Sequence, residues 1–165
     1  MENDLLRQAY ERYGREIYLY LYALCGNRTD AEDLTQETFM KALLSLSNEH
    51  PNVRAWLYTV ARNLFLDRAR KQTFEQPFGD EMPEMESETP EEVLQRKLTN
   101  QKLMQALIKL DPRKREVIVL QYFSGMSVKQ IAAVMGLTPE NVRVLAFRAK
   151  KDLKKYLEEN GYELQ

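Results

Sequence analysis

Residues 74–92, FEQPFGDEMPEMESETPEE, interrupt the chain with a segment that is too polar to build a packed core. The segment holds eight of the 25 acidic residues of the chain, three of its six prolines, and no lysine or arginine. Such a composition buries too little apolar surface to offset the entropy lost on ordering. The sequence therefore predicts two domains, residues 1–72 and residues 90–165, joined by a flexible acidic linker at residues 73–89.

The composition outside the linker predicts an all-α fold. Glycine is scarce, and residues that favour helices dominate. The sequence of the N-terminal domain predicts three or four helices. They include residues 3–25, a second helix that begins with a Thr29–Glu32 capping box, and residues 53–71. The C-terminal domain predicts four helices. Their start signals are Thr89-Pro90, Asp111-Pro112, Ser127 with Gln130, and Thr138-Pro139.

The distribution of charge matters more than the net charge of −1, which by itself argues against a nucleic-acid binder. Without residues 74–92, the chain has 24 basic and 17 acidic residues. Residues 109–155 alone hold eleven basic and four acidic side chains. The basic excess gathered in the C-terminal domain favours contact with DNA phosphates there.

Several classes of function lack support in the residues. The single cysteine, Cys25, lies in an apolar run and is predicted to be a buried thiol. There is one histidine, and we find no metal-ligand cluster, phosphate loop or nucleophile–base pattern, so we expect no metal, no cofactor and no catalytic residue. No signal region and no apolar run of membrane length is present, so we expect a cytoplasmic protein that does not insert into a membrane.

Residues 127–153, SVKQIAAVMGLTPENVRVLAFRAKKDL, predict a helix-turn-helix. Two amphipathic helices are joined by the short turn Gly136-Leu137-Thr138, and Ala132 permits their close approach. The second helix directs a partly basic side away from its apolar stripe, which suits entry into a DNA major groove. A plain helical hairpin with a solvated basic face is the alternative. The outward residues are Glu140, Asn141, Arg143, Val144, Phe147, Arg148 and Lys151.

Residues 56–71, WLYTVARNLFLDRARK, mix aromatic and basic side chains on one predicted helix. Tyr58, Arg62 and Phe65 share the side opposite the packed one. Rings beside cations suit unpaired bases, which stack while their phosphates meet the charges. The residues alone support single-strand binding and ordinary packing of Trp56 and Phe65 in the core equally well.

Residues 30–39, DAEDLTQETF, contain four carboxylates and no basic residue. The helical period places Ala31, Thr35 and Phe39 on the packed side. An acidic outer face repels DNA, so it is suited to a basic protein surface. A solvated face whose carboxylates complement the helix dipole is the alternative. The outward residues are Asp33, Gln36, Glu37 and Met40.

These segments, in this order and around an acidic linker, resemble the bacterial sigma-70 family of RNA polymerase sigma factors. The chain is similar to the extracytoplasmic-function (ECF) group, which keeps only conserved regions two and four. The resemblance implies a protein that binds core RNA polymerase, directs it to promoters of a stress or envelope regulon, and helps open the minus-ten region. It also implies a cognate anti-sigma factor, which in some relatives holds the sigma factor near the membrane.

The resemblance assigns roles to three groups of residues. The segment 30–39 implies core-polymerase contacts at Asp30, Asp33, Gln36 and Glu37. The segment 56–71 implies minus-ten recognition and melting by Trp56, Tyr58, Arg62, Asn63, Phe65, Arg70 and Lys71, with a flipped base captured by the preceding loop at 47–53. The last helix implies minus-thirty-five recognition, in which Phe147 either meets a thymine methyl or packs.

Two rival functions stay open from the residues. A transcriptional regulator that binds a duplex operator also uses a helix-turn-helix, but it needs neither the acidic helix nor the aromatic and basic one. A nucleic-acid enzyme would need a reactive cluster that we do not find in the sequence.

Overall fold

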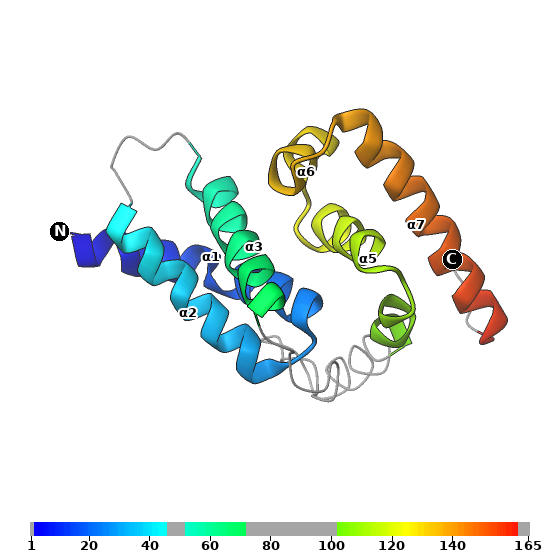
Figure 1. The fold of residues 1–165 in the computed structure, drawn as a ribbon, viewed down its shortest axis with the longest axis horizontal. Coiled ribbons are helices and arrows are strands. Elements are labelled where there is room, and N and C mark those ends of the chain that lie inside the picture. The colour runs from blue at the N-terminus through cyan, green and yellow to red at the C-terminus, as the bar shows by residue number, and fades with distance from the viewer. Residues whose placement is uncertain (1, 46–51, 72–101, 162–165) are drawn as a thin grey trace, which may run out of the picture.

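The computed structural model describes residues 2–45, 52–71 and 102–161, and every regular element in these ranges is helical. The N-terminal domain consists of α1 (Glu2–Cys25), α2 (Arg28–Ser45) and α3 (Val53–Lys71). The predicted first and third helices are confirmed. Figure 1 shows the three helices grouped on one side of the molecule.

The turn between α1 and α2 differs from its prediction. α1 ends at Cys25, and Gly26 has a positive φ of 72°, a conformation that glycine adopts without a steric penalty. The helix α2 begins at Arg28, and Oδ1 of Asn27 accepts a hydrogen bond from the backbone N–H of Asp30 at 3.0 Å. Asn27 is therefore the N-cap, and the predicted Thr29–Glu32 capping box is wrong.

The C-terminal domain contains helical residues 102–108, α5 (Pro112–Ile118), α6 (Val128–Met135) and α7 (Pro139–Glu159). α5 continues directly into a short π-helix, η1 (Val119–Phe123). The predicted start at Pro112 is confirmed, although the side chain of the preceding Asp111 accepts no capping hydrogen bond. The predicted start at Thr89-Pro90 lies outside the described residues.

The two helices of the helix-turn-helix begin at the predicted residues, and the first ends at the predicted glycine. Ser127 and Gln130 form a reciprocal capping box at the start of α6, and Gly136 ends that helix in the left-handed conformation. Thr138 then caps α7 by accepting a hydrogen bond from the backbone N–H of Asn141, with Pro139 in the first turn. These local signals turn the chain sharply enough to set α7 against α5 and α6.

The two domains share one continuous apolar core. α1 contacts α5 and η1, and α3 contacts α6, so buried side chains such as Leu21 and Leu57 belong to the same cluster as Leu120 and Ile131. Tyr20 of α1 and Tyr58 of α3 contribute rings whose centroids lie 5.0 Å apart. In Figure 1, α7 lies on the side of the C-terminal domain away from α1–α3.

Candidate functional site

The outer face of α2 is acidic, as predicted. Asp33, Gln36 and Glu37 are exposed, while the residues on the opposite side of the helix are buried against the rest of the domain, among them Ala31, Thr35 and Phe39. Two apolar side chains continue this surface: Met40 is 65 % exposed and Leu44 is 86 % exposed. Exposed apolar groups beside carboxylates fit contact with a protein rather than with DNA.

Arg68 of α3 pairs with two of these carboxylates, and sequence reasoning missed it. Its Nη2 lies 2.7 Å from Oε1 of Glu37, and its Nη1 lies 3.7 Å from Oδ1 of Asp30. Asp30 is half-buried, and its Oδ2 is buried without a hydrogen-bond partner among the described residues. Asp30 therefore lies in the α2–α3 contact, while Asp33 lies outside it. One sequence signal could have indicated this pairing: Arg68 lies four residues beyond Leu64, and therefore on the packed side of α3.

The side of α3 that carries Tyr58, Arg62 and Phe65 is not open. Tyr58 is fully buried, the Arg62 side chain is 15 % exposed, and Phe65 is half-buried. The predicted outward orientation is therefore wrong for Tyr58, because its ring packs against Tyr20 of α1 and its hydroxyl contacts Glu16 of α1 and Ser124 of the C-terminal domain. Trp56 is also half-buried and packs against the core.

The remaining residues predicted for minus-ten DNA lie at exposed positions of α3, Asn63 in the middle of the helix and Arg70 and Lys71 in its last turn. The two cations flank Asp67, whose carboxylate oxygens lie 3.5 Å from Nη2 of Arg70 and 3.2 Å from Nζ of Lys71. Exposed pairs of this kind contribute little to stability and separate readily, so both cations are accessible to a phosphate. The predicted loop at 47–53 falls largely outside the described residues.

Glu116 of α5 is a buried carboxylate whose hydrogen-bond donors come from the other domain. Its Oε2 accepts from the Tyr20 hydroxyl at 2.6 Å and from Nε of Arg62 at 2.8 Å. Burial raises the pKa of Tyr20 well above its ordinary value, and the charge of Glu116 adds to this. For Arg62, burial lowers the pKa, but the hydrogen bond and charge of Glu116 outweigh that effect and raise it.

Ser124, which follows the π-helix, makes a second polar contact with the N-terminal domain. Its carbonyl accepts a hydrogen bond from the Arg54 guanidinium. The Tyr58 hydroxyl lies 2.8 Å from Oγ of Ser124 and 2.9 Å from Oε1 of Glu16. Because a phenol has one proton, it donates to the carboxylate and accepts from Ser124. Burial is the main cause that raises the pKa of Tyr58.

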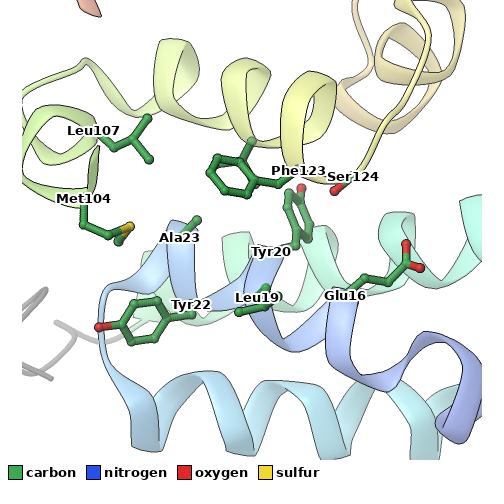
Figure 2. A pocket seen from close by; sticks show the side chains of 10 residues that line it. Glu16, Leu19, Tyr20, Tyr22, Ala23, Met104, Leu107, Phe123 and Ser124 are labelled. Atoms are coloured by element: carbon green, nitrogen blue, oxygen red, sulfur yellow. The ribbon is translucent and has the colours of Figure 1, made fainter. Parts of the chain in front are cut away.

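An apolar pocket lies at the junction of the two domains. α1 forms one wall with Leu19, Tyr22 and Ala23, and the C-terminal domain forms the other wall. Figure 2 shows Met104 and Leu107 across from these residues. Tyr20, whose hydroxyl donates to Glu116, also lines this pocket.

The outer face of α7 is exposed along its N-terminal half. Phe147 is 70 % exposed and Val144 is 46 % exposed, so Phe147 does not pack in the core. The buried stripe of Val142, Ala146 and Ala149 holds the helix in place. The other outward residues predicted to contact minus-thirty-five DNA are all exposed. They are Glu140, Asn141, Arg143, Arg148 and Lys151.

Within the described ranges, no group of histidine, cysteine, aspartate and glutamate side chains could hold a metal ion. None of the helices described here has the length and apolarity needed to cross a membrane. Cys25 is buried, as predicted, and its thiol donates to the carbonyl of Asn27 at 3.4 Å.

Two family models match the chain: Sigma-70 region 2 over residues 9–75, and Sigma-70, region 4 over residues 100–153. The chain is 33 % identical over 166 residues to the ECF RNA polymerase sigma factor BldN of Streptomyces coelicolor. This match covers 97 % of this chain and 63 % of that protein. It therefore spans less than two thirds of the length of this relative. It is 32 % identical over 158 residues to the RNA polymerase sigma factor YlaC of Bacillus subtilis, covering 92 % of this chain and 91 % of that protein.

The fold also matches a solved structure. The sigma factor RpoE in complex with the anti-sigma factor NepR from Bartonella quintana superposes with a TM-score of 0.74 at 25 % identity. The match covers 92 % of this chain and 96 % of that sigma-factor chain.

Proposed function

This chain belongs to the ECF sigma factors of bacterial RNA polymerase, and we propose that it binds core polymerase and directs it to specific promoters. One observation carries the proposal: two surfaces of opposite character are exposed on separate domains. The α2 face is acidic, and the outer face of α7 is largely basic and aromatic. A single DNA-binding surface would have no use for the first.

The acidic face is proposed to dock on a basic surface of core polymerase. Asp33 and Gln36 are exposed there, with Met40 and Leu44 supplying apolar contact area. Glu37 is shared with Arg68, so its charge is partly neutralised within the chain. Asp33 is therefore the carboxylate expected to contribute most to docking, and Asp30 the least.

The outer face of α7 is proposed to read duplex minus-thirty-five DNA in the major groove. Exposed arginine and lysine side chains set the register on phosphates, and the exposed Val144 and Phe147 offer apolar contacts to thymine methyl groups. The exposed side chains of α3, Asn63 in its middle and Arg70 and Lys71 in its last turn, are proposed to meet the melted minus-ten strand. The activity is binding and strand opening in the cytoplasm, with no bond-making step.

A cognate anti-sigma factor is proposed as a further partner. The superposed sigma factor RpoE is itself bound to an anti-sigma factor. An inhibitor that covers the α2 face or the exposed side chains of α3 would prevent docking and melting without acting on α7.

Promoter-specific transcription in vitro tests the proposal. Purified protein is mixed with sigma-free core polymerase and a library of upstream DNA from the source genome, and transcript starts are sequenced. The expected result is a set of starts aligned on two shared upstream motifs. If the protein neither co-elutes with core polymerase nor produces specific starts, while palindromic duplex sites are enriched by binding alone, an operator-binding regulator replaces the proposal.

Two variants make this test specific to α2. Asp33→Lys reverses an exposed charge on the proposed docking face and should abolish co-elution and specific starts. Glu159→Lys makes the same reversal at the far end of α7, where residue 159 is also exposed. The control variant should retain both signals. Loss of both signals in both variants would show that the acidic face has no special role.

A further inference from the structure

A groove lies between α1 and α2, beside the acidic face of α2. Its volume is about 500 Å³, which is large enough to receive a side chain of another protein. The groove includes Gln36, one of the residues predicted to contact core polymerase, so it is continuous with the proposed docking face. Its α2 side also includes Glu32, and its α1 side includes Tyr10, Glu11, Gly14 and Tyr18.

Gly14 lies at the base of this groove, since it is buried while Glu11 and Arg15 beside it are exposed. It occupies the interior of the 24-residue helix α1, where glycine is less stable than alanine. The three heavy atoms nearest to a β-carbon built at this position all belong to the Tyr10 ring, at 3.4–3.5 Å, which is an ordinary van der Waals separation. The fold therefore has room for an alanine here. What glycine adds is depth to the groove.

Two tyrosine rings line the groove, and contacts within the domain hold both in place. Tyr10 is 52 % exposed, and its ring meets the ring of the buried Phe39 edge to face, with the centroids 5.1 Å apart. Tyr18 is half-buried, stacks on Tyr22 with the centroids 6.3 Å apart, and bonds Arg28 through its hydroxyl. Rings that are already fixed in the free protein lose little conformational entropy when a guest packs on them.

Carboxylates stand on both helices that form the groove. Glu11 of α1 and Glu32 of α2 are exposed, and Gln36 offers an amide oxygen one turn beyond Glu32. Among the described lining residues, Arg15 is the cation, and it already takes part in interactions within the chain. Two carboxylates and one cation leave the groove with a net charge of −1, so it suits a positively charged guest.

An arginine side chain matches the shape and the chemistry of the groove. Its aliphatic stem can lie over Gly14, its planar guanidinium can stack on a tyrosine ring, and its N–H groups can donate to a carboxylate. Lysine would share the charge but not the flat face or the fork of donors. Tyrosine, glutamate and an open base are thus all used by one kind of guest.

We propose that the groove between α1 and α2 receives an arginine side chain of core polymerase, next to the basic surface that docks on α2. The inference rests on the proposed function and extends the docking surface from α2 onto α1. A buried arginine between aromatic rings is the kind of contact that dominates the affinity of a protein interface. Gly14 would then be kept for binding at some cost to the stability of α1.

Binding of the full chain to sigma-free core polymerase, measured by biolayer interferometry, tests the groove. Gly14→Met fills it with an uncharged side chain that favours helices. The affinity should fall at least tenfold. Gln8→Met is the matched control, because Gln8 is exposed on the same helix and does not line the groove. This variant should bind as tightly as the wild type.

Gly14→Ala separates a role in binding from a role in folding. Alanine favours the helix and has room at this position, so the thermal midpoint by circular dichroism should rise by about 2–4 °C. The methyl group makes the groove shallower, so the affinity for core polymerase should fall about threefold. A glycine needed only for packing would give a lower midpoint instead. The variant also keeps the groove testable if Gly14→Met does not fold.

Two further variants identify the guest. Tyr10→Leu keeps an apolar side chain but removes the ring face, and the affinity should fall about fivefold. Glu11→Gln combined with Glu32→Gln removes the carboxylates, and the affinity should fall about tenfold. If Gly14→Met weakens binding and neither of these variants does, the guest is apolar and the assignment to arginine is overturned.

The groove and the proposed function fail in different ways. A wild type that does not bind core polymerase would overturn the proposed function. If the wild type binds and Asp33→Lys abolishes binding, while Gly14→Met and Gly14→Ala bind at full affinity, only the groove is overturned. The same holds if the glutamate variant weakens binding and the Gly14 variants do not, because the attraction is then a general effect of charge.

Discussion

Arg68 of α3 holds its guanidinium 2.7 Å from the carboxylate of Glu37 on α2, across the contact between the two helices. The same guanidinium reaches the half-buried Asp30 at 3.7 Å. The single cation of Arg68 therefore holds α2, the helix that carries the proposed polymerase contacts, against α3. The acidic face is not merely a row of solvated charges, because part of it is fixed in position by an ion pair.

Replacing Arg68 with alanine should destabilise the N-terminal domain. The carboxylate of Asp30 would stay close to its half-buried position without a compensating cation, which costs about 1–3 kcal/mol. Urea denaturation followed by circular dichroism measures this change in the free energy of unfolding. Arg70→Ala is the control, since Arg70 is 76 % exposed in its pair with Asp67 and should change stability little. Equal effects of both variants would remove the special role of Arg68.

Phe147 should contribute to duplex promoter binding without contributing to stability. It is 70 % exposed on the outer face of α7, so Phe147→Ala should leave the thermal midpoint unchanged. If the ring meets a thymine methyl, affinity for the promoter duplex should fall about tenfold, which corresponds to roughly 1.4 kcal/mol. Electrophoretic mobility shift with the promoter found by transcript sequencing measures this loss.

Arg148→Ala provides a comparison with a different signature. A phosphate contact carries no sequence preference, so its loss should weaken binding to all duplexes alike and reduce the salt slope by about one ion. An alanine at position 147 that weakens promoter and random duplex equally would contradict base contact by Phe147.

The helices and most of their ends could be predicted from sequence because local chemistry decides them. Ser127 with Gln130, Gly136 and Thr138 each act within a few residues, and all three signals are confirmed. The start of α2 was misjudged for a local reason too. Asn27 and Thr29 are both good N-cap residues two positions apart, and the glycine turn at Gly26 brings Asn27 into the capping position.

The buried side of α3 could not be predicted in this way. A helical period identifies one apolar stripe, but α3 packs against two partners: its own domain and the C-terminal domain. Tyr58 and Arg62 are amphipathic enough to suit either solvent or a polar interface. Arg62 bonds Glu116 and Tyr58 contacts Ser124, both more than fifty residues away in sequence, and no local pattern carries that information.

Cys25 should resist alkylation in the native protein. Burial raises the pKa of its thiol from 9.0 to about 11. Below pH 9 the reactive thiolate is therefore about 100-fold rarer than for an ordinary cysteine, and its rate of labelling should keep rising as pH approaches 11. Iodoacetamide labelling followed by mass spectrometry, with and without urea, measures this. Rapid labelling of the native chain at neutral pH would contradict the burial of Cys25.

Tyr20 and Glu116 should be strongly coupled in a double-mutant cycle. Both are buried and joined by a 2.6 Å hydrogen bond between the domains. Tyr20→Phe leaves Glu116 with one donor fewer, and Glu116→Gln removes the charge that strengthens the bond. The coupling energy from urea denaturation of the two single variants and the double variant should be about 1–3 kcal/mol.

The combination of Tyr20→Phe with Asp152→Asn is the control cycle. Asp152 pairs with Lys114 within the C-terminal domain, so its effect should add to that of Tyr20→Phe within about 0.5 kcal/mol. Additive effects in the first cycle as well would mean that Tyr20 and Glu116 do not interact in solution. The domains would then be apart for most of the time, because this bond forms only when α1 and α5 are in contact.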